Sequence, residues 1–228
     1  MQGVTMQATA VSNVNIELVE KNRPKQKRAI RTYEAILSAA SELLLEVGLE
    51  KISTNNIAER AGVTVPALYR YFPNKYAVLN ALCSRLMASL NASCEGWRSE
   101  HLKGNPCGPA REDFLELLQS IHAIVRDFPG GLELLHAMQT MAPLKAVRMA
   151  GYWSIAEDFA EDWSCNSQLP LSQTSLQRLR MAVETGFGCV LIALEDARLD
   201  AAFVLSEGAA TLDLQLHLAA AHARSEMN

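Results

Sequence analysis

The chain has 228 residues, of which 49% are hydrophobic and 20% are charged, and its formal net charge is -4. This length and hydrophobic content exclude a wholly disordered chain and are sufficient for a sizeable buried core. Gly and Pro are few, at 12 and 8 residues, and Ala and Leu are abundant while β-branched runs are scarce. These features favour helix and argue against an all-β protein. We therefore expect an all-α fold.

The charge is divided unevenly along the chain. Residues 21–76 contain ten Lys and Arg against five Glu, a net charge of +5, and the remaining residues contain eleven against twenty Asp and Glu, a net charge of -9. A DNA backbone attracts a basic surface and repels an acidic one. Only one end of the molecule is therefore expected to approach a phosphate chain.

The cysteines indicate a reducing compartment. Their number is odd, no two lie within four residues, and no His–Cys cluster has metal-binding spacing. We interpret them as reduced thiols of a helical core, with a single redox-sensing thiolate as the open alternative. The sequence shows no signal peptide and no apolar run of about 18 residues. A cytoplasmic protein without a membrane segment is predicted. The cysteines are Cys83, Cys94, Cys107, Cys165 and Cys189.

Three segments are expected: a disordered leader at 1–24, a DNA-binding domain at 25–73 and a helical domain at 74–228. The leader is polar and aperiodic. The basic run at 21–31 is either a solvated tail or an arm that touches DNA phosphates. Apolar residues then recur at helical spacing over 29–47, and Gly48 stands where a helix would end.

Residues 53–75 have the pattern of a helix-turn-helix. Such a unit needs a small residue where two helices cross and a turn residue that tolerates positive φ, and Ala58 and Gly62 satisfy these needs. Thr54 is expected to cap the second helix and Thr64 the third, which is expected to span 65–72. Helices are then expected over about 75–97, 110–127, 132–141, 144–165, 172–197 and 200–223.

Two runs resemble the TetR family of bacterial repressors. They are ILSAASELLLEVGLEKISTNNIAERAG and AGVTVPALYRYFPNKYAVLNAL, and the resemblance covers about Arg28 to Leu82. It implies an N-terminal three-helix helix-turn-helix domain followed by a C-terminal helical ligand-binding and dimerisation domain. It also implies a homodimeric repressor that binds a palindromic operator and is released by a small-molecule effector.

The resemblance, with the chemistry of the residues, indicates which side chains meet DNA. Val65, Pro66 and Ala67 can touch thymine methyl groups but cannot form a bidentate bond to guanine. Direct base readout is therefore expected to be modest, with shape and phosphate contacts contributing the rest. The expected DNA contacts are Lys25, Lys27, Arg28, Thr54, Asn55, Thr64, Val65, Pro66, Ala67, Tyr69, Tyr71 and Lys75.

The resemblance further implies an effector cavity among the middle helices and a dimer interface on the last two. For each candidate cavity residue, a plain core role is the simpler interpretation. The candidates are His122, His136, Met138, Gln139, Met141, Trp153 and Phe187. Their character suggests a largely apolar effector. The expected interface residues are Leu176, Leu179, Val183, Phe187, Val190, Leu191, Leu194, Leu205, Leu212 and Leu216.

No enzymatic site is apparent in the sequence. It has no nucleophile–base pair and no phosphate-binding glycine loop, and we expect no cofactor and no metal. The acidic pairs Glu157-Asp158 and Glu161-Asp162 recur four residues apart, which is more typical of a solvated helix face than of a metal site. The alternatives to a ligand-responsive repressor are an architectural, nucleoid-type DNA-binding protein without an effector and, third, a helical enzyme. The expected partners are duplex DNA, a second copy of the chain and the effector, with no membrane.

Overall fold

The computed structural model describes residues 18, 20–21, 24–105, 108–167 and 172–225. Within these residues the chain forms nine α-helices and no strand. The predicted all-α fold is confirmed. The helices are α1 (Lys27–Lys51), α2 (Thr54–Arg60), α3 (Val65–Tyr69), α4 (Lys75–His101), α5 (Arg111–Asp127), α6 (Gly131–Thr140), α7 (Ala142–Ser167), α8 (Gln173–Glu195) and α9 (Ala201–Ser225).

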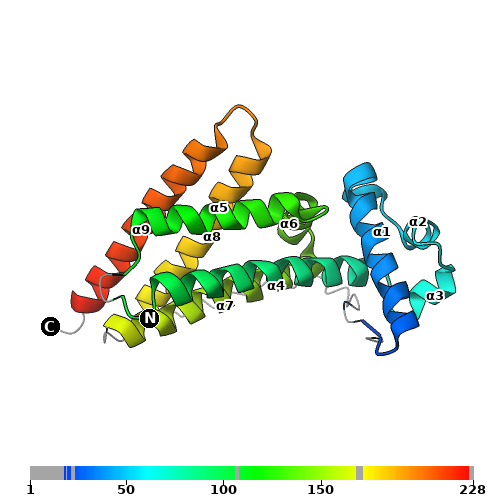
Figure 1. Ribbon diagram of the computed structural model, residues 1–228, viewed down its shortest axis with the longest axis horizontal. Helices are drawn as coiled ribbons and strands as arrows, with labels where there is room; N and C mark the ends of the chain where they lie inside the picture. Colours follow the sequence, from blue (N-terminus) through cyan, green and yellow to red (C-terminus); the bar gives the residue numbers. More distant parts are fainter. Residues whose placement is uncertain (1–17, 19, 22–23, 106–107, 168–171, 226–228) are drawn as a thin grey trace, which may run out of the picture.

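The helices form two parts joined by α4 (Figure 1). Helices α1 to α3 cluster at one end of the molecule, and we call them the head. Helix α4 runs from the head into the remaining helices, which we call the body, and packs along α7. Helices α8 and α9 form an antiparallel pair at the far end, with α5 packed against both.

The head is held by a core of aromatic and aliphatic side chains from α1 to α4. Phe72 is fully buried, and its ring stacks on that of Tyr33 with the centroids 5.1 Å apart. Ile36, Ile57 and Leu68 are also fully buried. Side chains from α1, α2 and α3 therefore meet in one cluster, which fixes the orientation of the short helix α3.

Several helix ends differ from the sequence prediction. Ser53, and not Thr54, caps α2, because its hydroxyl accepts from the Asn56 amide while the Asn56 side chain accepts from the Ser53 amide. Helix α3 ends at Tyr69, three residues earlier than expected. Helix α4 continues to His101, four residues beyond the predicted end.

Part of the predicted leader lies against the head and the first turns of α4. The Lys21 amide donates to the Tyr71 carbonyl at 2.9 Å, and the Tyr33 hydroxyl donates to Glu20 at 2.5 Å. The Asn80 side chain donates to the Leu18 carbonyl at 3.3 Å. Residues 1–17, 19, 22 and 23, on which the rest of the leader prediction falls, lie outside the described residues.

Candidate nucleic-acid interface and apolar cavity

The turn between α2 and α3 is tight and depends on Gly62. This glycine has a φ of 64°, in the left-handed region that other residues enter only at a cost. Its amide donates to the Glu59 carbonyl at 3.1 Å, and the next amide, of Val63, donates to the Ala58 carbonyl at 3.0 Å. The turn therefore redirects the chain directly into α3, as a helix-turn-helix requires.

The start of α3 lies at the surface of the head. Thr64 caps the helix, its hydroxyl accepting from the Ala67 amide at 3.3 Å, and both Thr64 and Pro66 are exposed. Val65 is partly buried and packs against the core of the head. The exposed part of this helix start is therefore small and largely apolar, as the sequence suggested.

Thr54 and Tyr69 join the two helices at the same surface. The Tyr69 side chain is 42% exposed, and its hydroxyl lies 3.2 Å from the Thr54 hydroxyl. Asn55, the next residue of α2, is also exposed. These three polar side chains lie at the surface beside the start of α3, where a phosphate group could accept hydrogen bonds from them.

Tyr71 and Lys75 make contacts within the protein. Tyr71 is only 9% exposed, and its ring packs edge-on against Tyr33 with the centroids 6.0 Å apart. The Lys75 ammonium group donates to the Ile52 carbonyl at 3.1 Å. The structure thus places the ring of Tyr71 in the head core, whereas Lys75 fastens the start of α4 to the head and keeps further N–H donors.

The basic residues of the head differ in their freedom to meet DNA. Lys25, Lys27 and Arg28 are exposed at the start of α1. Arg60 instead forms a bidentate pair with Glu46, at 2.5 Å and 2.7 Å, which also lowers the pKa of the Glu46 carboxyl through these hydrogen bonds. Positive charge available for phosphates is therefore concentrated at the N-terminal end of α1.

The body contains an apolar cavity of about 70 Å³ between α4, α5, α7, α8 and α9. Of the seven candidate effector residues, only Phe187 lines it. The other candidates lie elsewhere: His136 pairs with Glu195, Gln139 is exposed, and α6 packs on α1, α4, α5 and α7. The lining residues are Cys94, Phe114, Leu117, Leu118, Ile121, Ile155, Ala156, Phe159, Leu179, Ala182, Val183, Gly186, Phe187, Leu212 and Leu216.

The residues expected at a dimer interface face inward. Leu179, Phe187, Val190, Leu205, Leu212 and Leu216 are buried within the protomer. Leu176, Val183, Leu191 and Leu194 are partly buried and pack against the same core. Other large apolar side chains of these helices are exposed instead: Met181, Ile192, Phe203, Leu214 and Leu218.

The acidic face of α7 is partly paired. Arg98 of α4, with only 12% of its side chain exposed, pairs with Asp162 at 2.5 Å and with Asp158 at 3.4 Å. These contacts tie the acidic face to α4, whereas Glu157 and Glu161 are exposed. The sequence predicted a solvated face, and the structure shows that two of its carboxylates bind an arginine.

The buried cysteines are poorly suited to redox sensing. Burial raises the pKa of Cys94 to about 11 and that of Cys83 to about 12. The shift from the ordinary value of 9.0 lowers the thiolate fraction of Cys94 about 100-fold at neutral pH. Cys165 is exposed. Cys107 lies outside the described residues.

We expect Cys165 to be alkylated before Cys83, Cys94 and Cys189. A short iodoacetamide pulse at pH 7.5, followed by peptide mapping, measures the order, and the Cys165→Ser variant identifies the fast signal. Modification of Cys94 as fast as that of Cys165 would show that the cavity opens readily to solvent.

No helix in the described part of the chain combines the length and the apolar character that a membrane crossing requires.

The head has the fold and exposed surface of a helix-turn-helix DNA-binding domain. Residues 36–82 match the family model described as "Bacterial regulatory proteins, tetR family". The predicted resemblance to the TetR family is confirmed over these residues.

The curated relatives match only part of the chain. The chain is 44% identical over 79 residues to the tetracycline repressor protein class C of Escherichia coli, an alignment that covers 32% of this chain and 36% of the relative. The chain thus matches about a third of the length of such curated relatives. Sequence similarity to these relatives therefore covers only part of the chain.

Solved structures share most of the fold. A TetR-family regulator from Syntrophomonas wolfei has a TM-score of 0.65 and is 12% identical, with 82% of this chain and 96% of that chain covered. The SmeT–triclosan complex has a TM-score of 0.55 and is 23% identical, with 82% and 90% covered. The body thus keeps the architecture of these proteins while differing from them in sequence.

Proposed function

We propose that this protein is a homodimeric transcriptional repressor that binds a palindromic operator and is released from it by a small apolar molecule. The observation that carries the proposal is the exposed helix-turn-helix, in a segment that matches the TetR family model. The curated relatives that share this segment include several tetracycline repressors. The proposal assigns the protein no catalytic role.

The DNA-contacting surface in this proposal is narrower than the sequence suggested. Thr64, Val65, Pro66 and Ala67 face base edges from the start of α3. Thr54, Asn55, Tyr69 and Lys75 contact phosphates beside them, and Lys25, Lys27 and Arg28 add charge from the start of α1. Tyr71 supports the head from within, because its side chain is almost fully buried.

The second copy is proposed to pack on the outer faces of α8 and α9. Met181 and Ile192 are eleven residues apart on α8, and so are Phe203 and Leu214 on α9. Eleven residues is close to three helical turns, so each pair lies on one face. Exposed apolar surface on two adjacent helices suits a helix-bundle interface. Such a two-fold dimer would place two α3 helices on neighbouring turns of DNA.

The effector is proposed to occupy the apolar cavity. Its walls bear no charged side chain, so a neutral apolar ligand is favoured over an ionic one. The present volume is only about 70 Å³, so a larger effector must displace the surrounding helices. SmeT, which shares the fold, is known as a complex with triclosan.

Helix α4 provides the physical link between effector and DNA. Cys94, on the body side of α4, lines the cavity, and Lys75, at its other end, is hydrogen-bonded to the head. A ligand that favours a displaced α4 would change the separation of the two heads in a dimer. The ligand binds the two arrangements with different free energies. This difference sets how far the ligand can lower the affinity of the dimer for its operator.

Selection from a random duplex library tests the function directly. The full chain is mixed with the library at moderate salt, and the retained duplexes are sequenced. Enrichment of an inverted repeat supports the proposal. Equal retention of all sequences would instead support an architectural DNA-binding protein. A panel of neutral apolar compounds, each compared with a charged analogue, is then screened for release of the selected duplex.

Lys75→Ala is expected to weaken binding to all duplexes about equally. Loss of one phosphate contact reduces the slope of log K against log salt by about 1. Binding of the selected duplex at several salt concentrations measures this slope. Lys145→Ala, which removes an exposed charge from α7 in the body, is the matched control. An unchanged slope for Lys75→Ala would remove this residue from the proposed contacts.

A further inference from the structure

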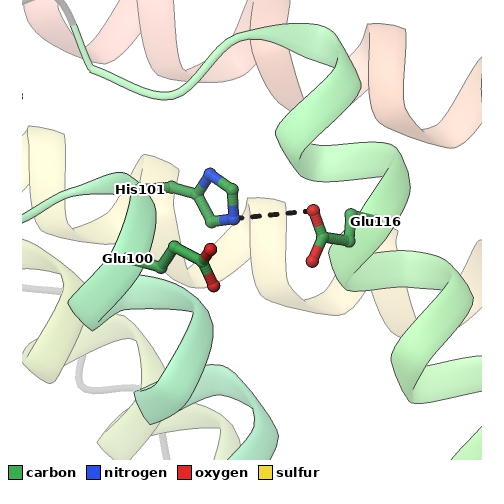
Figure 2. A group of neighbouring side chains, drawn as sticks. All are labelled: Glu100, His101 and Glu116. Carbon is green, nitrogen blue, oxygen red and sulfur yellow. Dashed lines mark ion pairs between the residues drawn. The ribbon is translucent and has the colours of Figure 1, made fainter.

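Three metal-ligating side chains meet where the end of α4 packs against α5. Glu100 and His101 are the last two residues of α4, and Glu116 lies on α5. One potential ligand atom from each lies within 4.8 Å of the others. Figure 2 shows the two carboxylates and the imidazole directed toward a common space. Neither the repressor function nor the apolar cavity uses these residues.

The imidazole of His101 is held in place by contacts to its Nδ1 atom and to its ring. Its Nδ1 lies 3.1 Å from the Asp113 carboxylate, and its ring packs against that of Trp97 with the centroids 5.4 Å apart. Asp113 is itself fixed, because its carboxylate accepts from the Ala110 amide at 2.8 Å and its carbonyl from the Trp97 indole at 2.7 Å. A carboxylate on Nδ1 favours the proton there and directs the lone pair of Nε2 outward, as in carboxylate–histidine–metal sites.

The Nε2 atom of His101, which is directed away from Asp113, has no hydrogen-bond partner among the described residues. His101 Nε2 is buried, and the nearest carboxylate oxygen, of Glu116, is 3.6 Å away, too far for a hydrogen bond. A lone pair facing a carboxylate is repulsive unless a proton or a cation lies between them. The two ligand classes present, imidazole and carboxylate, are those that bind Zn²⁺ and related divalent cations.

The surroundings also favour a cation. Glu100, Asp113 and Glu116 place three carboxylates around one imidazole. The site lies at the C-terminal end of α4, where the carbonyl groups of the last turn are directed outward and the helix dipole is negative. Both glutamates are exposed, so their side chains can close toward the spacing of about 3.3 Å between ligands in a tetrahedral zinc site.

We propose that Glu100, His101 and Glu116 bind one divalent transition-metal ion of the Zn²⁺ type, with Asp113 orienting the imidazole. His101 contributes Nε2 and each glutamate contributes a carboxylate oxygen, and water completes the coordination. The ion would join the end of α4 to α5. This site goes beyond the proposed repressor function and can be tested without DNA.

Calorimetric titration of the full chain with Zn²⁺ tests the site, in a Cys165→Ser background that removes the one thiol classed as exposed among the described residues. One ion is expected to bind, and Glu116→Gln and His101→Gln are each expected to weaken its binding at least tenfold. Glu95→Gln removes one negative charge, as Glu116→Gln does, but at an exposed position of α4 outside the proposed site. This variant is the control and should leave the affinity for Zn²⁺ unchanged. Circular dichroism confirms that each variant is folded.

Two further readouts separate this site from other zinc ligands. Bound Zn²⁺ should shift the Nε2 resonance of one histidine in nitrogen-15 spectra, and His101→Gln should remove that signal. The thermal midpoint should rise with Zn²⁺ in the parent chain but not in Glu116→Gln, because ligand binding stabilises the folded state. Unaltered zinc affinity in both variants, or no saturable binding, would overturn the proposal.

Discussion

Replacing Phe203 and Leu214 together by Asp is expected to convert the protein into a folded monomer with little affinity for its operator. Both side chains are well exposed, at 60% and 59%, so charge at these positions should not disturb the protomer. In the proposed dimer they are buried, and an unpaired buried carboxylate is strongly unfavourable. Loss of the second head removes the gain from bivalent binding, so operator affinity should fall about 100-fold or more.

Light scattering at micromolar concentration measures the oligomeric state, and titration of the selected duplex measures the affinity. Leu45→Asp, which introduces one such carboxylate at a 58% exposed leucine of α1, is the control for the oligomeric state. If the double variant remains dimeric, the outer faces of α8 and α9 are not the interface. If the parent chain is itself a monomer, the dimer proposal fails without reference to any variant.

Phe72→Ala is expected to destabilise the head by about 3–5 kcal/mol. Phe72 is fully buried and stacks on Tyr33, so truncation removes a large apolar surface and leaves a cavity beneath α3. The head should then open far more often than in the parent chain, and α3 should lose its fixed orientation. Operator affinity should fall although residue 72 touches no DNA.

Hydrogen exchange of the amides in residues 53–76 reports this opening. A loss of about 3–5 kcal/mol corresponds to an increase of about 100-fold or more in exchange rate. Amides of α8 and α9 should be unaffected if the head opens on its own. Ile30→Ala, at an exposed position of α1, should change the rates little. Equal protection in Phe72→Ala and the parent chain would contradict the role assigned to this side chain.

The helix-turn-helix could be predicted because its determinants are local. Gly62 in the turn and Thr64 before α3 mark the start of α3 through backbone geometry and hydrogen bonds with near neighbours. The local signals were misleading at the ends of α3 and α4 and where neighbours compete, as with Ser53 and Thr54. There the reciprocal bonds with Asn56 decide in favour of Ser53.

The cavity could not be predicted in the same way. Helical periodicity identifies inward-facing residues, and Phe114, Leu118 and Ile121 have that spacing on α5. It does not reveal which inward residues leave space between them, because this depends on how five helices cross. His122, next to Ile121, and the residues of α6 therefore resembled cavity residues in the sequence although the fold places them elsewhere.

The outer faces of α8 and α9 present the same difficulty. Both helices carry apolar residues on more than one side, so their periodicity does not separate a face that packs inside the protomer from one left for a partner. Burial in the structure makes that distinction, with Leu212 inside and Leu214 outside.

By itself, the sequence determined the all-α class, the position of the DNA-binding unit and the basic character of its end of the chain. These properties depend on composition and on contacts between near neighbours. Only the tertiary structure decided which apolar residues surround the cavity, which remain exposed on α8 and α9, and that His101 meets Glu116. Such relations join residues far apart in the chain, and they arise only when helices with similar apolar faces pack at particular angles and depths.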